Sequence, residues 1–482
     1  MLANGNGDGL RSWLQGIRDR EDVIDIQGAD WRDEVGAITE MLQKQPGSPA
    51  ALFDHVCDYP AGYRILVNAF NSVQRLAYTL GLDEKQDKLL LSRALCSRLE
   101  QLEPVKPAVI KTGPIFENSH EGKEIDLLEF PVPKWHQGDG GRYIGTGCNV
   151  ITQSHDGSWV NLGTYRVMAL SGNQATVHIV PGHHGYLHLQ EYYARKERCP
   201  VVVATGEDPL LFLASCNDVP AGTSELDWAG GLCGRPVNVV IGPKTGLPIP
   251  AEAEIAFEGF IEPDNTAKEG PFGEWTGYYG ETTIAPVIDI EAVYHRHNPI
   301  LLGTPHSKPP DETAFLKAVF RSAMLEKSLR LSGVPNIQGC WAHEIGGGRL
   351  LLAVGIKQEH VGHASQAGHV AASCQIGALL GRYIVVVDED IDVTSLEDVM
   401  WAVLTRSDPA SSVDIIHRAW GSPLDPRMSP CDKRGRRWAT SRAIVDATRP
   451  FEWKEHYPRV VANWDGSQVV KKWPFLSEYS KY

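Results

Sequence analysis

The spacing of apolar residues predicts that the folded part of the chain opens on a helix. Leu10, Trp13, Leu14 and Ile17 recur at helical spacing, directly after a segment rich in Gly and Asn. On a helix these four side chains share one face, which suits packing against a core. Mixed short helical and strand patterns follow, so we expect residues 1–115 to form an N-terminal α/β domain.

Strand patterns dominate the next part of the chain, residues 116–305. Apolar runs occupy residues 200–206 and 236–242. In residues 251–260, apolar side chains at 251, 253, 255 and 257 alternate with glutamates at 252, 254 and 258. Because successive side chains of a strand point to opposite faces, this alternation predicts a β-rich domain whose sheet has one solvent-exposed face.

The last part of the chain, residues 306–482, predicts a linking helix followed by an α/β domain. Apolar residues stay on one helical face from 311 to 333 and stop at Gly333, about five turns later. A helical pattern around 360–380 and a buried-strand pattern over 383–392 follow. Thr394 and Glu397 then have the spacing of a capping box, which predicts the start of another helix.

Composition and charge narrow the class of protein. The chain has 482 residues, 42% hydrophobic and 22% charged, which fits a folded protein of two to four domains. Its formal net charge is −14, and no run rich in Lys and Arg reverses this charge locally. A nucleic-acid partner is therefore not expected, since a phosphate backbone would be repelled.

The cysteines and the chain start predict a cytoplasmic protein. Nine cysteines are present without a CxxC pair, and an odd number cannot pair completely within one chain, so we expect reduced thiols. The first residues lack the basic and apolar regions of a signal peptide. No run of about 18 apolar residues occurs, so no membrane association is expected.

The stretch EGPFGEW at 269–275 carries two candidate catalytic carboxylates. Glu269 and Glu274 lie five residues apart, across two glycines and a proline that prevent a helix. One interpretation is a solvated loop, because Glu is mostly exposed and Gly/Pro clusters mark turns. The other is a pair of acids held together for chemistry, which the sequence around residue 161 makes more attractive.

A second candidate site combines amide, imidazole and carboxylate groups. Asn161 and Arg166 lie five apart in the strand-like run NLGTYRVMAL, and histidines follow at 178, 183, 184 and 188. Such histidines are often only hydrogen-bonding groups. Together with Glu225, however, Asn161 and a histidine form a set of oxygen and nitrogen ligands without thiolate, which suits Mn²⁺ or Mg²⁺.

Five segments, in this order along the chain, resemble the UbiD-like decarboxylase family, which uses prenylated FMN. They are NLGTYR at 161–166, the turn at His184, VPAGTSE ending at Glu225, EGPFGE at 269–274, and VVVDEDIDVTSLEDVMWAVLTRSDPA at 385–410. Both five-residue spacings are kept, and the resemblance extends from near residue 10 to the SPLDP stretch at 422–426.

The resemblance implies a role for each matching residue. Arg166, Glu269 and Glu274 would form the catalytic network. Asn161, His184 and Glu225 would hold Mn²⁺ or Mg²⁺ against the flavin phosphate, with K⁺ nearby. The other expected contacts are Arg166, His183, Ser215 and Cys216 for the cofactor, and His183, Trp275 and Leu424 for the substrate. Gln375 stands where some relatives have a flavin-contacting lysine.

The proposed chemistry depends on unequal carboxyl groups. Two carboxyl groups close together have different apparent pKa values, and the pKa of the one without an Arg partner is raised. We expect Glu269 to pair with Arg166 and Glu274 to donate a proton. As the resemblance implies it, the substrate bonds covalently to the cofactor, CO₂ leaves, and Glu274 protonates the carbon. Carbanion character at that carbon demands an electron sink that no side chain provides.

The resemblance also implies the fold, reaction and partners. We expect residues 116–305 to form a split β-barrel of the FMN-binding type, with prenylated FMN between this barrel and the C-terminal domain. The expected reaction is reversible, non-oxidative decarboxylation of an aromatic (hydroxybenzoate-like or heteroaromatic) or α,β-unsaturated acid. A prenylated-flavin synthase would supply the cofactor, and the chain would form a dimer or hexamer. The alternatives are a split-barrel flavin oxidoreductase and a non-catalytic subunit of a carboxylase complex.

Overall fold

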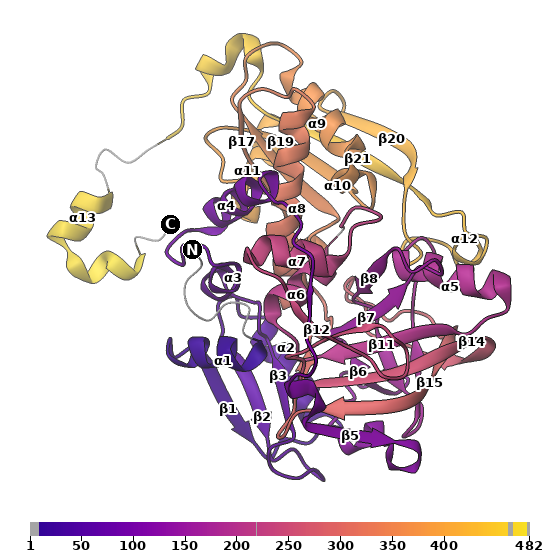
Figure 1. Cartoon of the computed structure of the whole chain (residues 1–482). Helices are drawn as coiled ribbons and strands as arrows, with labels where there is room; N and C mark the ends of the chain where they lie inside the picture. The colour runs from indigo at the N-terminus through magenta and orange to yellow at the C-terminus, as the bar shows by residue number, and fades with distance from the viewer. Residues whose placement is uncertain (1–8, 218, 461–465, 480–482) are drawn as a thin grey trace.

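The computed structural model describes residues 9–217, 219–460 and 466–479. Its N-terminal part packs helices against a four-stranded sheet (Figure 1). The sheet has the order β1 (Val23–Gln27), β2 (Ala50–Asp54), β3 (Arg64–Val67) and β16 (Ile300–Gly303). The helices are α1 (Leu10–Arg18), α2 (Glu34–Gln43), α3 (Val73–Leu80) and α4 (Lys88–Glu100).

Helix α1 confirms the amphipathic pattern at the start of the chain, because its four periodic apolar residues are all buried. Strand β16 pairs in parallel with β3, although it lies more than 200 residues further along the chain. The N-terminal sheet is therefore completed by a strand that follows the central region in the sequence.

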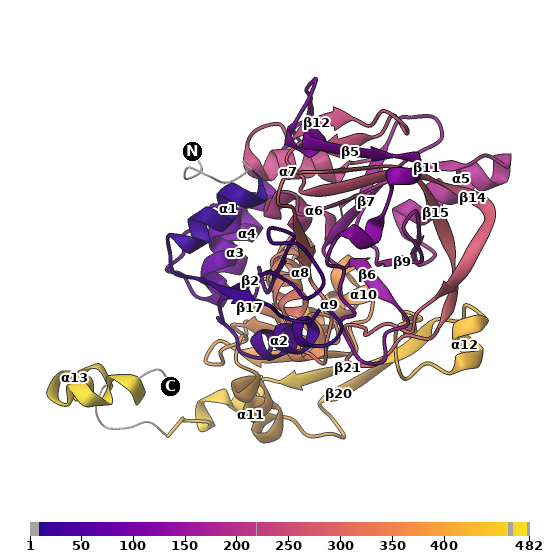
Figure 2. The same ribbon diagram turned by 90° about the horizontal axis from the view of Figure 1, so that it is seen from below.

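A nine-stranded sheet forms the central region. Its order is β6 (Arg142–Gly145), β9 (Val167–Ala169), β10 (Gln174–Val177), β15 (Thr283–His295), β14 (Ile255–Glu269), β11 (Cys199–Thr205), β7 (Cys148–Gln153) and β8 (Val160–Gly163), and β5 (Asn118–Glu121) adds to β15. The two ends of this order, β6 and β8, do not pair within the described part of the chain. The sheet is strongly curled in Figure 2, which confirms the expected split barrel within a mixed α/β fold.

Smaller elements surround this barrel. A three-stranded sheet has the order β13 (Pro248–Pro250), β12 (Asn238–Ile241) and β4 (Ala108–Val109). The helices of this region are α5 (His184–Arg195), α6 (Pro209–Ser215) and α7 (Glu225–Cys233), and short 3-10 turns include η3 (Leu127–Glu129). The run 161–170, expected to be strand-like throughout, is divided between β8 and β9, with Arg166 in the connection.

The predicted solvent-exposed face of residues 251–260 is wrong. Strand β14 begins only at Ile255, and the side chains of Glu254 and Glu258 are fully buried. Glu254 forms an ion pair with Arg11 at 2.8 Å. Glu258 accepts a hydrogen bond from the Tyr294 hydroxyl at 2.8 Å. An alternation of charged and apolar residues does not show that the charged side chains are exposed, because buried partners can satisfy their carboxylates.

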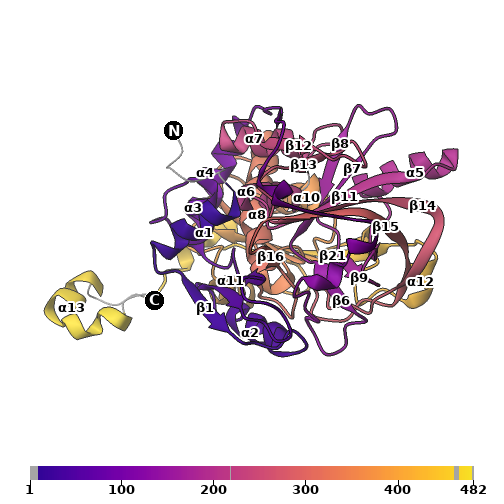
Figure 3. The ribbon, with the colours of Figure 1, turned by 60° about the horizontal axis from the view of Figure 1, so that its bottom comes forward.

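Helix α8 (Glu312–Leu331) confirms the predicted long helix, with Asp311 as its N-cap. It packs against α4 on one side and the C-terminal sheet on the other (Figure 3). That sheet has the order β17 (Ile337–Ala342), β18 (Leu351–Ile356), β19 (Tyr383–Asp388), β21 (Ala439–Ala447) and β20 (Val413–Trp420). One hydrophobic core runs from α1 through α8 to β19, so α8 braces the N-terminal and C-terminal parts.

The C-terminal helices are α9 (His363–Ser373), α10 (Gln375–Ala378), α11 (Leu396–Arg406), α12 (Pro430–Arg434) and α13 (Gly466–Lys472). The N-cap of α11 is Ser395, whose side chain accepts from the Asp398 N–H, and not the predicted Thr394. The Thr394 hydroxyl instead donates to Asp392. The capping position is thus one residue later than the capping-box spacing predicted.

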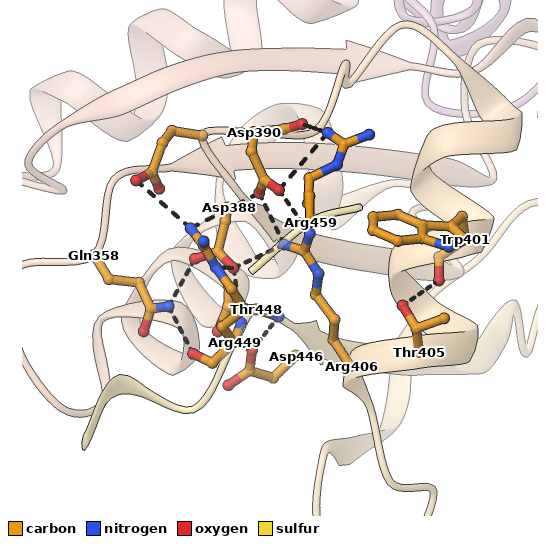
Figure 4. Close-up of polar contacts among 11 residues, drawn as sticks. Gln358, Asp388, Asp390, Trp401, Thr405, Arg406, Asp446, Thr448, Arg449 and Arg459 are labelled. Carbon is orange, nitrogen blue, oxygen red and sulfur yellow. Dashed lines mark hydrogen bonds and ion pairs between the residues drawn. The ribbon is translucent and has the colours of Figure 1, made fainter. Parts of the chain in front are cut away.

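Ion pairs fasten the end of the C-terminal sheet. Asp388, at the end of β19, lies 3.0 Å from Arg406 and 3.1 Å from Arg449, and Asp390 lies 2.7 Å from Arg406 (Figure 4). Asp388 and Arg406 are almost fully buried. The cluster therefore joins β19, the end of α11 and the segment after β21.

Within the described ranges, none of the helices combines the length and apolar character that crossing a bilayer requires.

Candidate active site

The two acids of the EGPFGEW stretch meet on one guanidinium. Glu269 is the last residue of β14, and Glu274 lies in the loop that leads towards β15. Arg166 donates from Nε and Nη2 to the two Glu269 carboxyl oxygens, at 2.8 and 2.9 Å. Its Nη1 donates to Glu274 Oε1. A bidentate pair of this kind fixes the plane of the guanidinium.

The loop geometry explains how Glu274 returns to the arginine. Gly270 has a φ of +84°, a conformation that side chains other than glycine rarely adopt. Further along, the Glu274 N–H donates to the Tyr278 carbonyl at 3.0 Å, which closes a tight turn. Glu269 is fully buried and Glu274 is 6% exposed. The solvated-loop interpretation is therefore wrong.

The roles expected for the two acids need one correction. We expected only Glu269 to have an arginine partner, but Arg166 contacts Glu274 as well. The distinction between the acids lies in the number of donors. Besides Arg166, Glu269 accepts from the Tyr143 hydroxyl at 2.8 Å, and His178 Nδ1 lies 3.3 Å from its other oxygen.

These donors set the charge of Glu269. Burial alone would raise the pKa of Glu269, but hydrogen bonds from His178 and Arg166 outweigh it and lower that pKa to about 2. Burial likewise raises the pKa of Tyr143, and the neighbouring Glu269 carboxylate raises it further. Glu269 is thus a permanent anion, and Tyr143 a permanent donor, near neutral pH.

Sequence reasoning missed Tyr143 altogether and named His178 only as one histidine of a group. Tyr143 lies on β6. This strand pairs with β9, which begins directly after Arg166. The His178 N–H donates to the Arg166 carbonyl, so backbone pairing brings that ring beside the network. Neither position carries a local sequence signal, because only the pairing of β6, β9 and β10 brings them to Glu269.

The three expected metal ligands lie around β8. Asn161 is on β8 and is 2% exposed. Glu225, the first residue of α7, accepts from the N–H of the next residue on β8, Leu162, at 2.7 Å. His184 opens α5, and its ring lies 4.7 Å from that of Trp159, just before β8. Two helix starts thus present their side chains to one strand.

The chemistry of this set fits a hard divalent cation. Glu225 is 3% exposed, and burial raises its pKa to about 7 even though backbone N–H groups oppose the shift. In the described part of the chain its hydrogen-bond partners are backbone N–H groups and not a cationic side chain. A bound cation would compensate such a buried carboxylate, and amide and carboxylate oxygens with one imidazole suit Mn²⁺ or Mg²⁺.

The remaining residues that were expected to contact the cofactor lie close to the connection between β8 and β9. The Thr164 hydroxyl is 3.1 Å from the Ser215 hydroxyl and 3.4 Å from the Cys216 sulfur. The His183 ring is 5.8 Å from that of Tyr165. The end of α6 and the start of α5 therefore both approach residues 164–165, between Asn161 and Arg166.

The expected substrate residues are more widely distributed. Trp275 is 5% exposed and lies under the Arg349 guanidinium, 4.7 Å from the ring centroid. Leu424 is half-buried in the loop after β20, where its N–H donates locally to Ser422. Gln375 is exposed at the start of α10. Trp275 follows Glu274 directly, and the roles of Trp275, Leu424 and Gln375 all stay predictions.

Family models match almost the whole chain. Those described as the N-terminal, Rift-related and C-terminal domains of 3-octaprenyl-4-hydroxybenzoate carboxy-lyase match residues 14–94, 108–309 and 314–447. Pyrrole-2-carboxylic acid decarboxylase from Pseudomonas aeruginosa is 30% identical over 461 residues, which cover 92% of this chain and 91% of that protein.

Solved structures agree with this assignment. The UbiD-class enzyme HmfF from Pelotomaculum thermopropionicum, in complex with FMN, matches with a TM-score of 0.85 and 26% identity, over 97% of this chain and 100% of that one. Vanillic acid decarboxylase from Sedimentibacter hydroxybenzoicus matches with a TM-score of 0.84 and 27% identity, over 98% and 99%. The chain therefore belongs to the UbiD family and is a carboxy-lyase of that family.

Proposed function

We propose that this carboxy-lyase is a prenylated-FMN-dependent, reversible, non-oxidative decarboxylase. Its substrate class would be an aromatic acid, hydroxybenzoate-like or heteroaromatic, or an α,β-unsaturated acid. The observation that carries the proposal is the buried Arg166 held between Glu269 and Glu274. Similar proteins named for pyrrole-2-carboxylic, vanillic and 3,4-dihydroxybenzoic acids favour the aromatic class.

Asn161, His184 and Glu225 would hold Mn²⁺ or Mg²⁺, which would in turn bind the flavin phosphate, with K⁺ close by. His183, Ser215 and Cys216 would line the same cofactor site. The HmfF structures with FMN and with prFMN support a prenylated flavin as the cofactor. When bound, this flavin supplies an electron sink for the pair released as CO₂ leaves.

The protein's own residues would position the acid and return a proton. Arg166 has two bonds to Glu269 and one to Glu274, so an incoming substrate carboxylate would compete for the single bond. Glu269 keeps Arg166 in place, helped by Tyr143 and His178. Once displaced, Glu274 would pass a proton from solvent to the carbon that has lost CO₂.

We further propose that residues 1–115, 116–305 and 306–482 act as three domains, with the cofactor between the second and the third. Cys216, on the barrel side, supports this placement. Burial raises its pKa, while Lys317 of α8 and Arg349 before β18 act in the opposite direction. Cations from the C-terminal side thus reach a residue expected at the flavin.

The first test is CO₂ release by protein produced with and without a prenylated-flavin synthase. A panel of pyrrole-2-carboxylic, vanillic, 3,4-dihydroxybenzoic and cinnamic acids would sample the substrate class. We expect activity only in the co-produced protein, together with a bound flavin heavier than FMN by mass spectrometry. Full activity in flavin-free protein, or none in flavin-loaded protein with any acid, would overturn the proposal.

The metal set has its own test. His184→Ala should lose both Mn²⁺ and flavin, measured by elemental analysis and visible absorbance, while circular dichroism shows a folded chain. His155→Ala is the matched control, since His155 pairs with Glu197 at 2.8 Å near the surface and lies outside the set. Stoichiometric metal and flavin in His184→Ala would show that the ligand set is wrong.

A further inference from the structure

A second group of metal-ligating side chains lies at the far end of the central sheet. His120, Glu129 and His295 each offer one ligand atom, and these atoms all lie within 4.8 Å of one another. His120 is on β5, Glu129 ends η3, and His295 ends β15. The three residues therefore come from segments that are separate in the sequence.

Strand pairing explains why the two histidines share a face. Strand β5 lies beside β15 (Figure 1) and runs antiparallel to it, with His120 opposite Val293 and Asn118 opposite His295. The two histidines are thus diagonal neighbours across the pair. Their ring centroids lie 5.3 Å apart. This register is set by backbone hydrogen bonds, so the separation does not depend on flexible loops.

The protonation state of His295 leaves a lone pair available. Its Nδ1 lies 2.9 Å from the Arg296 carbonyl oxygen, which only accepts, so Nδ1 carries the proton. Nε2 is then unprotonated, and it has no hydrogen-bond partner within the described ranges, although His295 is only 4% exposed. A histidine that donates one N–H to a carbonyl and presents the other nitrogen is typical of metal ligands.

Glu129 is also left unsatisfied. Its Oε1 is buried and without a hydrogen-bond partner in the described part of the chain. The nearest cationic candidate, His120 Nδ1, lies 3.8 Å away, which is too long for a hydrogen bond, and that nitrogen is closer to the Glu124 carbonyl, at 3.2 Å. Burial raises the pKa of Glu129, and burial lowers the pKa of His295. Both shifts are those of groups that lack a counter-charge.

We propose that His120, Glu129 and His295 form a site for a divalent transition-metal ion of the zinc type. Two imidazoles and one carboxylate are a ligand set that Zn²⁺ accepts in tetrahedral geometry, with water in the fourth position. Mn²⁺ and Mg²⁺ prefer sites richer in oxygen, such as Asn161, His184 and Glu225. The ion would fasten β5 and the turn at 127–129 to the end of β15.

This site is independent of the decarboxylase chemistry. Thr283, at the start of β15, pairs with Glu269, whereas His295 is at the other end of the strand, twelve residues later. At about 3.3 Å per residue, the two ends lie roughly 40 Å apart along β15. Loss of the zinc-type site should therefore leave flavin content unchanged.

The experiment counts zinc in metal-free protein dialysed against Zn²⁺, with Co²⁺ as a spectroscopic probe. Wild type should bind one equivalent of zinc more than Glu129→Gln and His295→Ala, or its affinity for zinc should be at least about tenfold higher. Even the loss of a residue that only supports a metal ligand typically lowers metal affinity by about tenfold. Glu129→Gln preserves size at a partly exposed position, so it remains informative if His295→Ala fails to fold. Zn²⁺ should raise the melting temperature of wild type more than that of Glu129→Gln, which keeps only the Asn161, His184 and Glu225 set.

His297→Ala is the matched control, because His297 is exposed, two residues from His295, and near Asn118 rather than the cluster. It should bind zinc as wild type does. Equal zinc stoichiometry and affinity in wild type, Glu129→Gln and His295→Ala would overturn the proposal. So would zinc binding that disappears only in His184→Ala, since the ion would then occupy the other set.

Discussion

At the scale of single residues, the two acidic partners of Arg166 differ in how many groups bind them. Glu269 has two guanidinium bonds, a tyrosine donor and a histidine neighbour. Glu274 has one guanidinium contact. A substrate carboxylate that replaces the single Arg166–Glu274 bond therefore releases Glu274, whereas Glu269 keeps its other hydrogen bonds. The acid with fewer partners is the better candidate for moving a proton during turnover.

We predict that Glu274→Gln keeps flavin and metal but loses turnover. The amide has almost the same size and cannot donate a carboxylic proton, so the rate should fall by about 10²–10⁴. CO₂ release and exchange of the product hydrogen with deuterated solvent both report on this proton. Glu281→Gln, an exposed glutamate of the same loop, should retain wild-type rates.

Glu269→Gln should behave differently, because it leaves a buried arginine without its main counter-charge. Flavin content as well as rate should then decrease. Wild-type rates for Glu274→Gln in both assays, with flavin bound, would remove this residue from the mechanism.

Glu207 is a second residue whose charge matters, here for stability. It is fully buried just after β11, and its carboxyl oxygens have no hydrogen-bond partner of good geometry in the described ranges. Burial raises its pKa from 4.5 to about 8. Between these values the folded chain holds a proton that the unfolded chain releases, so stability falls as pH rises through this window.

We predict that Glu207→Gln removes this loss. Between the two pKa values, ionisation of Glu207 lowers the free energy of unfolding by at most about 5 kcal/mol. The variant should match wild type near pH 5 and melt several degrees higher at pH 9, measured by calorimetry. Glu262→Gln, at an exposed position, should follow wild type at both values. A Glu207→Gln melting temperature below that of wild type at pH 9 would contradict the prediction.

At the scale of elements, the start of α11 distinguishes two neighbouring hydroxyl residues. Ser395 accepts from the Asp398 N–H at 3.1 Å, whereas Thr394 donates to Asp392 at 2.8 Å. Ser395→Ala should therefore cost about 1 kcal/mol of stability, the usual loss for an N-cap. Thr394→Ala should cost less. Denaturant midpoints measure both, and the reverse order would restore Thr394 as the cap.

Elements with a strong local period were predictable, and the details at their ends were not. Helices α1 and α8 follow from the spacing of their apolar residues, and strand β19 follows from a continuous apolar run, because these residues pack into the core. The cap of α11 and the start of β14 differ from the prediction, since both depend on which backbone groups find partners. Periodicity reports a buried face and says little about ends.

At the scale of the whole molecule, helix α13 lies outside the body of the chain. It is separate from the four sheets in Figure 1, Figure 2 and Figure 3. Trp473 and Phe475, which follow it, are 47% and 69% exposed. Large apolar groups in such a position are suited to contact with another protein surface, and we expect a second copy of this chain to cover them.

The predicted assembly is a dimer or hexamer. Light scattering should give a mass that is a multiple of 53.0 kDa. A variant with Trp473→Ser and Phe475→Ser should shift towards the monomer, because each change removes apolar area from the contact. Met41→Ser, at a 71% exposed position on α2, is the control and should not shift. A monomeric wild type would contradict the prediction.

The sequence by itself determined the family, the order of elements and the residue types of the expected active site. Glu269 and Glu274 could be named because they are only five positions apart, and residues so close in the sequence stay close however the remaining chain packs. Asn161, Arg166, a group of histidines and Glu225 stood out by residue type. Their roles, and the choice of His184 within that group, came only through resemblance to a family, since they are scattered over more than sixty positions.

Only the tertiary structure decided which groups touch. It placed Arg166 against both acids, added Tyr143 and His178 to Glu269, and buried carboxylates that alternation had placed in solvent. It also brought His120 to His295, although they are 175 positions apart in the sequence. The physical reason is that such contacts depend on the pairing and register of β5, β6, β9, β10 and β15, and strand pairing over long separations leaves no period in the sequence.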